Sequence, residues 1–530
     1  MKSAYLKTLL LVSPWIIYGC KSSPEYDIED RPNILIAMGD DISYPHMGAY
    51  GTAWTKTPAF DRVAKEGILF SNVYTPNAKS SPSRACFLTG RNSWQLEAAC
   101  NHVPYFPSRF TGFIEAIGRN GYYTGYTGKG WAPGAAFDSL GNERQLTGRP
   151  FNEKTTAPPA SGISNIDYAA NFAAFLDSRT EKKPFCFWYG SKEPHRKYEY
   201  GSGVKKGGKK PDEIKAIPAF WPDDPAVRND LLDYAFEIEY FDSQLNAMLK
   251  LLEEKGELEN TIVIVTADNG MPFPRAKGQA YEYSNHVPMA VMWGKGIRNP
   301  GRKVSDFISF IDIPPTILEI AAIPESGAGM QKITGRSITD IFSSGRSGYL
   351  KKERNHVLIG RERNDVGRNN DNGYPVRGII RDGFLYLSNY APERWPGGNP
   401  ETGYPDCDGS PTKSLILSMR RSGISSGYWM MSFGKRGDEE LYELSKDPAC
   451  INNLAVDPSY NPTKRRLHEQ LYLELLEQDD PRAFGRGDVF DKYPYADESV
   501  RDFHARFLKR ELPRKSAAWI DSTDFETEGF

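Results

Sequence analysis

The chain has 530 residues, which is long enough for a large hydrophobic core and points to two domains, since single cores rarely grow past about 250–300 residues. Its formal net charge is −2 at pH 7, so no overall field draws it to nucleic acid, and any preference for an anionic substrate must come from local groups. Aromatic residues make up 12% of the chain; we expect most of them in the core, although such residues also suit stacking on sugars.

Residues 1–20 have the pattern of an export signal: two lysines, an apolar run over 9–17 and a small-residue cleavage site. The apolar run is too short to span a bilayer. The segment ends on Gly-Cys, before a polar linker, and so resembles a bacterial lipoprotein signal in which Cys20 becomes the lipidated N-terminus. A plain secretory signal is the alternative. We expect a lipid-anchored protein in the periplasm or on the cell surface of a Gram-negative bacterium.

Five further cysteines are odd in number and widely spaced: Cys86, Cys100, Cys186, Cys407 and Cys450. This distribution argues against a disulfide framework, and none of the spacings is typical of zinc ligands. We expect at most one or two disulfide bridges.

An apolar run over residues 32–38 predicts a strand buried on both faces of a parallel sheet. Asp40 and Asp41 follow this run almost directly. Ligands of open α/β sheets sit beyond the carboxyl ends of the strands, so two adjacent carboxylates at that place are candidate ligands for a hard cation. A solvated Asp-Asp turn is the alternative for this segment taken alone.

Residues 57–70 predict a short amphipathic helix, a glycine stop and a strand, an order typical of βαβ units. A second helix is predicted from Ser80, because Pro82 suits a first helical turn and Gly90 ends the helix. Backbone N–H groups and the positive end of the helix dipole gather at Ser80, and Arg84 lies one turn further on. An oxyanion at Ser80 would therefore be stabilised, although an ordinary capped helix is the alternative for this pattern in isolation.

Two more strands are predicted to lead into chemically useful side chains. A helix over 113–117 precedes a strand over 121–129 that ends on Lys129, and a buried strand over 184–191 leads to His195. Taken singly, a terminal lysine usually faces solvent, and a histidine past a strand end is more often structural than catalytic. The pattern alone leaves both roles open.

Glycines surround four lysines in the following segment: Lys205, Lys206, Lys209 and Lys210. This composition predicts a mobile basic loop. Such a loop either meets polyanionic glycans or is merely a soluble loop.

Apolar residues recur at helical spacing between Asp230 and Leu252 and predict the clearest long helix of the chain. An apolar, β-branched run over 261–267 follows, and Asp268 and Asn269 come directly after it. This arrangement repeats that of the first strand and its two aspartates. Together the four side chains predict an all-oxygen calcium site at neighbouring strand ends.

Glycine and serine residues between Ser343 and Gly348 predict a domain boundary. Beyond it, alternation over 374–388 indicates strands, and a helix is predicted over about 462–478. The expected fold is α/β, with a large mixed, mostly parallel sheet sandwiched by helices and a smaller C-terminal α+β domain. The predicted divisions are a signal peptide at 1–20, a linker at 21–30, a catalytic domain at 31–345 and a C-terminal subdomain and tail at 346–530.

The helix start at Ser80 carries a longer pattern, Ser-Ser-Pro-Ser-Arg, followed by Thr-Gly-Arg at 89–91. It resembles the sulfatase signature, in which Cys or Ser, any residue and Pro-Ser-Arg are followed by Thr-Gly-Arg. The resemblance covers roughly residues 30–456, and residues 307–322 are similar to the family's helix after the last strand of its large domain. It implies an alkaline phosphatase-like fold and a sulfuric ester hydrolase activity.

The resemblance also implies roles for single residues. Ser80 occupies the position that the family oxidises to formylglycine (3-oxoalanine) with a dedicated maturation enzyme. One hydroxyl of the hydrated formylglycine attacks sulfur in this family, and Arg84 would hold that hydroxyl. Lys129 and Lys277 match the sulfate-contacting lysines, and His195 matches the proton donor for the leaving oxygen.

One calcium ion is implied as the cofactor of the same site. The residues that match its ligands are Asp40, Asp41, Ser80 (as formylglycine), Asp268 and Asn269.

Trp131 departs from the family pattern, because it stands where the family has the histidine of a Gly-Lys-x-His motif. That histidine helps break down the sulfo-enzyme, and tryptophan cannot take a proton. We hypothesise that Lys129, His286 or a water replaces it. His286 and Arg275 lie close to the second lysine in the sequence, but no motif assigns them a role.

The phrase Asn-Gly-Met-Pro-Phe-Pro at 269–274 resembles the N-sulfoglucosamine sulfohydrolase branch more than the arylsulfatase branch. Export and aromatic content favour a sulfated polysaccharide, ulvan for example, as the substrate in a marine or gut bacterium, and O- and N-sulfate both stay open. One alternative is a phosphohydrolase that uses plain Ser80 as nucleophile, although the extra metal and histidine ligands of such enzymes are not found in the sequence. Another is a non-enzymatic lipoprotein that binds sulfated glycans through a degenerate site.

Overall fold

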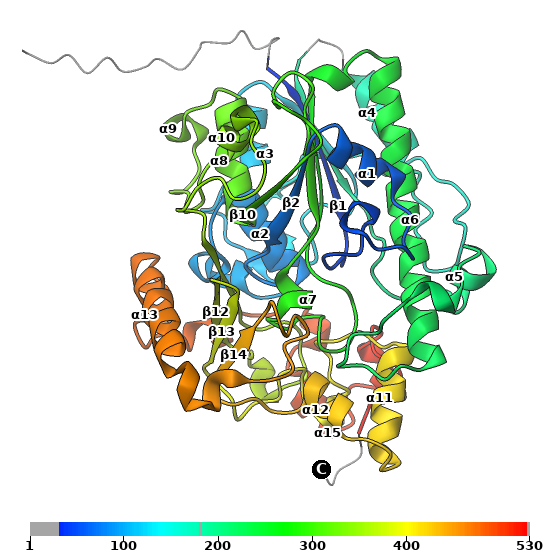
Figure 1. Ribbon diagram of the computed structural model, residues 1–530, viewed down its shortest axis with the longest axis vertical. Helices are drawn as coiled ribbons and strands as arrows, with labels where there is room; N and C mark the ends of the chain where they lie inside the picture. Colours follow the sequence, from blue (N-terminus) through cyan, green and yellow to red (C-terminus); the bar gives the residue numbers. More distant parts are fainter. Residues whose placement is uncertain (1–30, 180–182, 527–530) are drawn as a thin grey trace, which may run out of the picture.

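The computed structural model describes residues 31–179 and 183–526 (Figure 1). Its central sheet has eight strands: β1 (Asn33–Gly39), β2 (Ile68–Tyr74), β4 (Tyr123–Gly128), β6 (Arg149–Pro150), β7 (Phe185–Gly190), β8 (Thr261–Ala267), β9 (Met289–Met292) and β10 (Arg302–Ser309). Their spatial order is β10-β2-β9-β8-β1-β7-β4-β6. Strand β9 runs antiparallel to both neighbours, and the other pairs are parallel. The predicted mixed, mostly parallel sheet is confirmed.

Helices cover both faces of this sheet, with α6 on one side and α3 and α8 on the other (Figure 1). Alternate residues of β1 enter two separate cores: Ile34 and Ile36 pack with the layer of Phe87, whereas Leu35 packs with the layer of Leu245. Strands buried on both faces therefore read as continuous apolar runs. The main helices are α1 (Pro58–Lys65), α2 (Ser80–Thr89), α3 (Phe113–Arg119), α4 (Tyr168–Ser178), α6 (Pro225–Glu254) and α8 (Ile313–Ile320).

Two element bounds differ from the sequence-based expectation. Helix α6 begins five residues early, because Asp224 accepts the N–H of Ala226 and Pro225 suits the first turn. The helix expected over 307–322 begins only at Ile313, after a short 3₁₀ turn. Its first residues, 307–309, belong to β10, where they pair with β2.

A second, antiparallel sheet follows in the C-terminal part: β11 (His356–Arg361), β12 (Val376–Arg381), β13 (Phe384–Asn389) and β14 (Glu439–Glu443). Helix α13 (Asn461–Glu477) packs against it at the lower left of Figure 1, so the expected α+β region is confirmed. The domain boundary near residue 345 stays a prediction. The remaining elements are β3 (Tyr105–Phe106), β5 (Ala135–Ala136), α5 (Ser202–Lys205), α7 (Glu282–Asn285), α9 (Glu325–Ala328), α10 (Thr339–Ser344), α11 (Pro411–Arg421), α12 (Gly427–Phe433), α14 (Val489–Lys492) and α15 (Phe503–Leu508).

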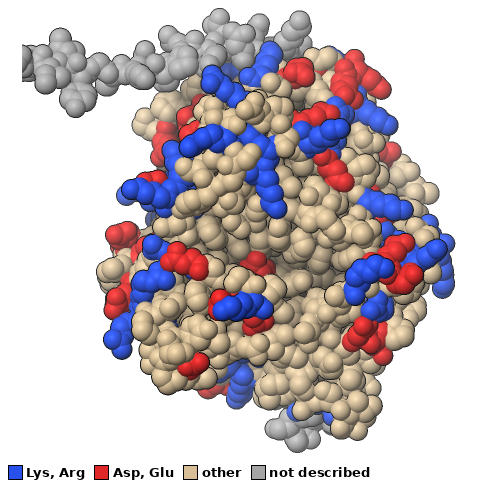
Figure 2. Space-filling view, in the orientation of Figure 1, with Lys and Arg blue, Asp and Glu red and all other residues tan. Residues whose placement is uncertain are grey.

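Several sequence-based expectations concern the surface and the chain ends. The signal peptide, Cys20 and the linker lie outside the described residues. Within 31–179 and 183–526, no helix is both long and apolar enough to cross a membrane. All five cysteines of this part are free and buried, so it contains no disulfide. Acidic and basic side chains are interspersed on the face shown in Figure 2, in line with the near-zero net charge.

Candidate active site

Four neighbouring parallel strands, β8, β1, β7 and β4, end at the same edge of the sheet. Asp268 and Asn269 follow β8, Asp40 and Asp41 follow β1, and Lys129 follows β4. Their side chains meet because parallel strands present their carboxyl ends together. We call Asp40, Asp41, Ser80, Lys129, Asp268 and Asn269 the strand-end cluster.

Ser80 is the first residue of α2 and is 2% exposed. Its Oγ donates to Asp40 Oδ1 at 3.1 Å and accepts from Lys129 Nζ at 2.9 Å. The helix ends where predicted, at Gly90, whose φ of 70° lies in the left-handed region that glycine adopts without strain. The Ser80 hydroxyl thus sits at a positive helix end, between a carboxylate and an ammonium group.

Arg84 is fully buried one turn into α2. Its Nε donates to Asp268 Oδ2 at 2.9 Å, and one terminal nitrogen donates to the carbonyls of Lys129 and Gly130, both at 2.9 Å. The other terminal nitrogen has no hydrogen-bond partner and lies 3.7 Å from Asp40 Oδ1. The guanidinium is therefore held rigidly with one nitrogen left to bind a ligand atom near Ser80.

Opposite charges balance each other within the cluster. Lys129 Nζ contacts both oxygens of Asp40, at 2.7 and 2.9 Å, and Lys277 Nζ contacts both oxygens of Asp41. Burial raises the pKa of the Asp40 carboxyl, but Lys129 and the other cations nearby outweigh it and hold that pKa well below its usual range. Burial and the negative charge of Asp40 raise the pKa of Asp268 by more than Arg84 lowers it, so this pKa is above its usual value.

The residues of the cluster fit a hard cation. Oxygens of Asp40, Asp41 and Asp268 lie within 4.8 Å of one another. Asn269 Nδ2 donates to Asp41 Oδ1 at 2.6 Å, and the buried Asn269 Oδ1 has no hydrogen-bond partner. Carboxylate and amide oxygens are the ligands that calcium and magnesium take in proteins. A buried oxygen without a hydrogen-bond partner is therefore available to bind such a cation.

His195 lies on the loop after β7, and its side chain is 33% exposed. Its Nδ1 lies 2.8 Å from the carbonyl oxygen of Arg196, an arrangement in which Nδ1–H donates. Its Nε2 is 3.9 Å from Asp41 Oδ2 and 4.0 Å from Asp408 Oδ1. Two carboxylates thus flank the nitrogen that faces the site.

The residues discussed as substitutes for a missing histidine lie in different places. Trp131 donates from its indole nitrogen to the carbonyl of Ser81 at 3.0 Å, so it borders the nucleophile helix. His286 is buried, and its ring nitrogens contact Glu282 and the carbonyl of Ser71, away from the cluster. Arg275 donates to the carbonyls of Met431 and Cys450, as a structural clamp. Of the two side chains proposed to replace the family histidine, Lys129 and His286, only Lys129 contacts Ser80.

Three aspartates of the C-terminal part contact residues at or next to the site, Asp406 through its backbone carbonyl, and sequence reasoning missed them: Asp365, Asp406 and Asp408. We call them the C-terminal rim. Asp365 forms an ion pair of 2.7 Å with Lys79, the residue directly before Ser80, and Asp408 approaches His195. No motif marks them; the signal available was a pair of aspartates around Cys407 in a Gly/Pro-rich loop.

One of the four lysines expected in a mobile basic loop is buried. Lys205 ends the short helix α5, and Lys206 pairs with Glu199. Lys209 is 4% exposed and pairs with Glu239, so it is a structural residue. The Lys209–Glu239 pair anchors the segment, whereas Lys205, Lys206 and Lys210 are exposed. The mobility of this loop and its contact with polyanionic glycans stay predictions.

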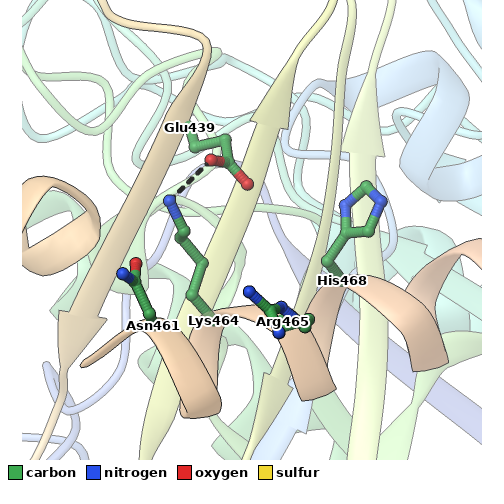
Figure 3. A pocket seen from close by; sticks show the side chains of 5 residues that line it. All are labelled: Glu439, Asn461, Lys464, Arg465 and His468. Carbon is green, nitrogen blue, oxygen red and sulfur yellow. Dashed lines mark hydrogen bonds and ion pairs between the residues drawn. The ribbon is translucent and has the colours of Figure 1, made fainter. Parts of the chain in front are cut away.

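Two hollows among the described residues lie elsewhere and contain none of the predicted site residues. One of about 270 Å³ is lined by Glu439, Asn461, Lys464, Arg465 and His468, and Lys464 points at Glu439 (Figure 3). Another, of about 530 Å³, separates β10 from α13 and mixes acidic and basic side chains. The strand-end cluster is the place where the chemistry gathers.

A hydroxyl at a helix N-terminus, three carboxylates that fit a cation, and two lysines are the parts of a hydrolase that acts on a small anionic ester. The profile of the Sulfatase family matches residues 32–323, more than half of the chain, and the chain belongs to this family. It is therefore a sulfuric ester hydrolase.

Individual relatives agree with this assignment. The chain is 26% identical over 492 residues to N-sulphoglucosamine sulphohydrolase of Homo sapiens, covering 85% of this chain and 91% of that protein. It is 27% identical over 517 residues to an ulvan-active sulfatase of Formosa agariphila, covering 89% and 79%. A solved complex of BT4656 with its substrate D-glucosamine-2-N,6-O-disulfate superposes with a TM-score of 0.61 at 19% identity, covering 85% of this chain and 98% of that one.

Proposed function

We propose that this sulfatase hydrolyses sulfate esters of a sulfated carbohydrate through a formylglycine made from Ser80 and one calcium ion. The observation that carries the proposal is the position of Ser80 Oγ, which is within hydrogen-bond distance of Asp40 and Lys129 at the start of α2. The calcium ligands would be the five residues named from the sequence: Asp40, Asp41, Ser80 (as formylglycine), Asp268 and Asn269.

Attack on a sulfate ester requires that its negative charge be neutralised and that the nucleophile be stronger than an alcohol. The formylglycine would supply a hydrated aldehyde for the attack, and a bound cation would supply Lewis acidity. Lys129 Nζ donates to the atom at the Ser80 Oγ position and so orients it. Lys277, buried beside Asp41, places a second positive charge at the site.

Arg84 and His195 complete the proposed chemistry. The free nitrogen of Arg84 would hold the reacting hydroxyl, since the rest of the guanidinium is fixed by Asp268 and two carbonyls. His195, with Nδ1–H donated to a carbonyl and Nε2 flanked by carboxylates, would hold a proton at Nε2 and pass it to the leaving oxygen. In this proposal Lys129 or a water takes the place of the histidine that Trp131 replaces.

The carbohydrate substrate is supported by the names of the relatives, among which sulfatases that act on sulfated glycans recur. The similarity to N-sulphoglucosamine sulphohydrolase keeps N-sulfate as a second candidate bond. A phosphohydrolase with unmodified Ser80 is the runner-up, because the same donors would also receive a phosphate. Export and a lipid on Cys20 are proposed from the sequence of residues 1–20 and fit a polymer substrate outside the cell.

The first experiment is mass spectrometry of the Ser80 segment in protein from its native host. Trypsin would leave only residues 80–84, so chymotrypsin, which cuts after Tyr74 and Phe87, gives the better fragment. We expect the loss of two hydrogens at Ser80, together with sulfate release from sulfated polysaccharides. Unmodified Ser80 in a chain that hydrolyses phosphate esters would replace the sulfatase mechanism by that of the runner-up.

A fractionation experiment tests the anchor. Wild-type protein should sediment with membranes and incorporate labelled fatty acid, whereas Cys20→Ser should stay soluble and unlabelled. Equal behaviour of the two proteins would contradict lipidation.

A further inference from the structure

Asp408 differs from every other carboxylate around the site in having no hydrogen-bond donor. It is 4% exposed, its Oδ2 is buried without a partner, and no residue of the described ranges donates to either of its oxygens. Its neighbours Asp365 and Asp406 are saturated: Asp365 accepts from His102 and Tyr495 and pairs with Lys79. A bare buried carboxylate is costly, so a native structure that keeps one needs a reason.

The charges that face Asp408 keep it ionised. Lys277, Lys79 and the imidazole of His195 are the basic groups around it, and Asp365 is the nearby like charge. Burial raises the pKa of the Asp408 carboxyl, and these basic groups lower it by more, so it stays below its usual range. The group therefore acts only as an acceptor of hydrogen bonds.

The position of Asp408 relates it to the leaving group. Its Oδ1 lies 4.0 Å from His195 Nε2, the nitrogen that would protonate the ester oxygen. When that oxygen is hydrogen-bonded to Nε2, a hydroxyl on the adjacent ring carbon lies within hydrogen-bond range of the ester oxygen itself. The same hydroxyl can then reach the bare carboxylate, whereas a second sulfate at that place would meet a like charge.

We propose that Asp408 accepts a hydrogen bond from the substrate hydroxyl next to the scissile sulfate, so that the site selects sulfated rings with a free vicinal hydroxyl. This inference rests on the proposed function and extends it to the class of substrate. The residue comes from beyond the family profile match, which ends at 323. Selectivity would thus be added to a general sulfate site by the C-terminal rim.

A minimal pair of probes tests it: trans-2-hydroxycyclohexyl sulfate and cyclohexyl sulfate, which differ only in the vicinal hydroxyl. We expect formylglycine-bearing wild type to prefer the hydroxylated probe by about 10- to 150-fold in kcat/KM, the range for a hydrogen bond to a charged group. Asp408→Asn and Asp408→Ala should lower this preference about tenfold or more, because the rate on the hydroxylated probe should fall by more than the rate on cyclohexyl sulfate. Asp177→Asn, an exposed carboxylate paired with Lys255, is the control and should keep the preference.

The other outcomes are distinct. Equal wild-type rates on the two probes, or a preference that survives in Asp408→Asn, overturns the inference. A parallel fall on both probes would mean that Asp408 acts through His195, and loss of one bound divalent metal in Asp408→Asn would mean that it is a ligand beside Asp41 and His195; either result also overturns it. If wild type releases sulfate from the polysaccharides but from neither probe, the hydroxyl gives no help and the inference fails. If it releases sulfate from nothing, the proposed function itself fails.

Discussion

The strand-end cluster and the C-terminal rim both surround Ser80, but they treat their polar groups differently. In the rim, Asp365 and Asp406 are fully paired, the latter with Arg361 and Arg368. In the cluster the amide oxygen of Asn269 is buried without a partner, and so is a nitrogen of Arg84, which binds Asp268 of the cluster. Saturated charges hold two parts of the chain together, whereas unsatisfied ones sit where a ligand completes them. By this criterion Asp408 is the one rim carboxylate that belongs with the cluster.

The largest effect should come from the nucleophile. Ser80→Ala is expected to lower kcat by at least about 10⁴-fold, because no other side chain can replace the attacking group. Ser81→Ala is the matched control: Ser81 accepts the backbone N–H of Val103, so its loss should reduce stability by about 1 kcal/mol and leave most activity. Sulfate release and thermal unfolding measure both. A fully active Ser80→Ala protein would show that Ser80 is not the nucleophile and that the strand-end cluster is not the catalytic site.

The pairing of the rim can be broken at Asp365. Asp365→Asn leaves the buried Lys79 without its counter-charge and should cost about 3–5 kcal/mol of unfolding free energy at pH 7. Exposed Asp177→Asn should change it by less than about 1 kcal/mol. Denaturant titration of both variants compares them, and equal small losses would show that the rim carries little of the stability.

The same residue predicts a pH dependence. Burial raises the pKa of Asp365, but Lys79 and His102 lower it further, so the folded value lies below the unfolded value of about 3.9. Its stabilisation is then complete above the unfolded pKa and is lost as the pH falls toward the folded one. Wild type should lose stability more steeply than Asp365→Asn as the pH falls below about 5, where the unfolded chain begins to take up the proton, and the loss should continue toward the folded pKa. Parallel curves would contradict this assignment.

Removal of the proposed calcium ion tests whether the unpaired groups of the strand-end cluster bind a cation. Chelation should abolish activity and destabilise the fold by about 2.7 kcal/mol relative to calcium at a hundred times its Kd, because an ion that binds only the folded state stabilises it by mass action. Calcium should restore both. Asp268→Asn should lose most of this response and Asp408→Asn should keep it. A chelator-insensitive wild type would argue against a metal at the cluster.

The smallest effect on turnover is expected at His286. Its ring nitrogens are both engaged, and the ring stacks on Tyr44 and Tyr74, so His286→Ala should lose about 1–3 kcal/mol of stability yet keep kcat within about twofold. Initial rates at a temperature where the variant is fully folded decide this. A large loss of kcat there would make the histidine a candidate proton acceptor again.

The sequence was sufficient for the central sheet and for the cluster, because both depend on local order. A buried strand is an apolar run, and the residues directly after it in the chain also lie beyond its end in space, as with Asp40 after β1 and Asp268 after β8. The signature at Ser80 is likewise contiguous. Gathering these residues required only that their strands be parallel neighbours.

The rim was not predictable in that way. Asp365 meets Lys79, and Asp408 meets His195, only through the packing of the C-terminal sheet and loops, and neither residue stands in a pattern that states its partner. The prediction for Lys209 fails for a similar reason. The sequence places Lys209 among loop residues, and its ion pair with Glu239 forms only because the loop packs against α6. Ion pairs between distant segments depend on tertiary contacts that no periodicity records.

The Lys79–Asp365 pair has a consequence for biosynthesis. A modifying enzyme needs an extended, accessible segment, whereas Ser80 in the finished fold is buried and helical, with its preceding residue clamped by a carboxylate. Asp365 leaves the ribosome long after Lys79, so during translation there is an interval in which the segment exists and its clamp does not. If Ser80 is converted, the conversion belongs to that interval, and a chain that folds before it is complete would stay permanently in its serine form.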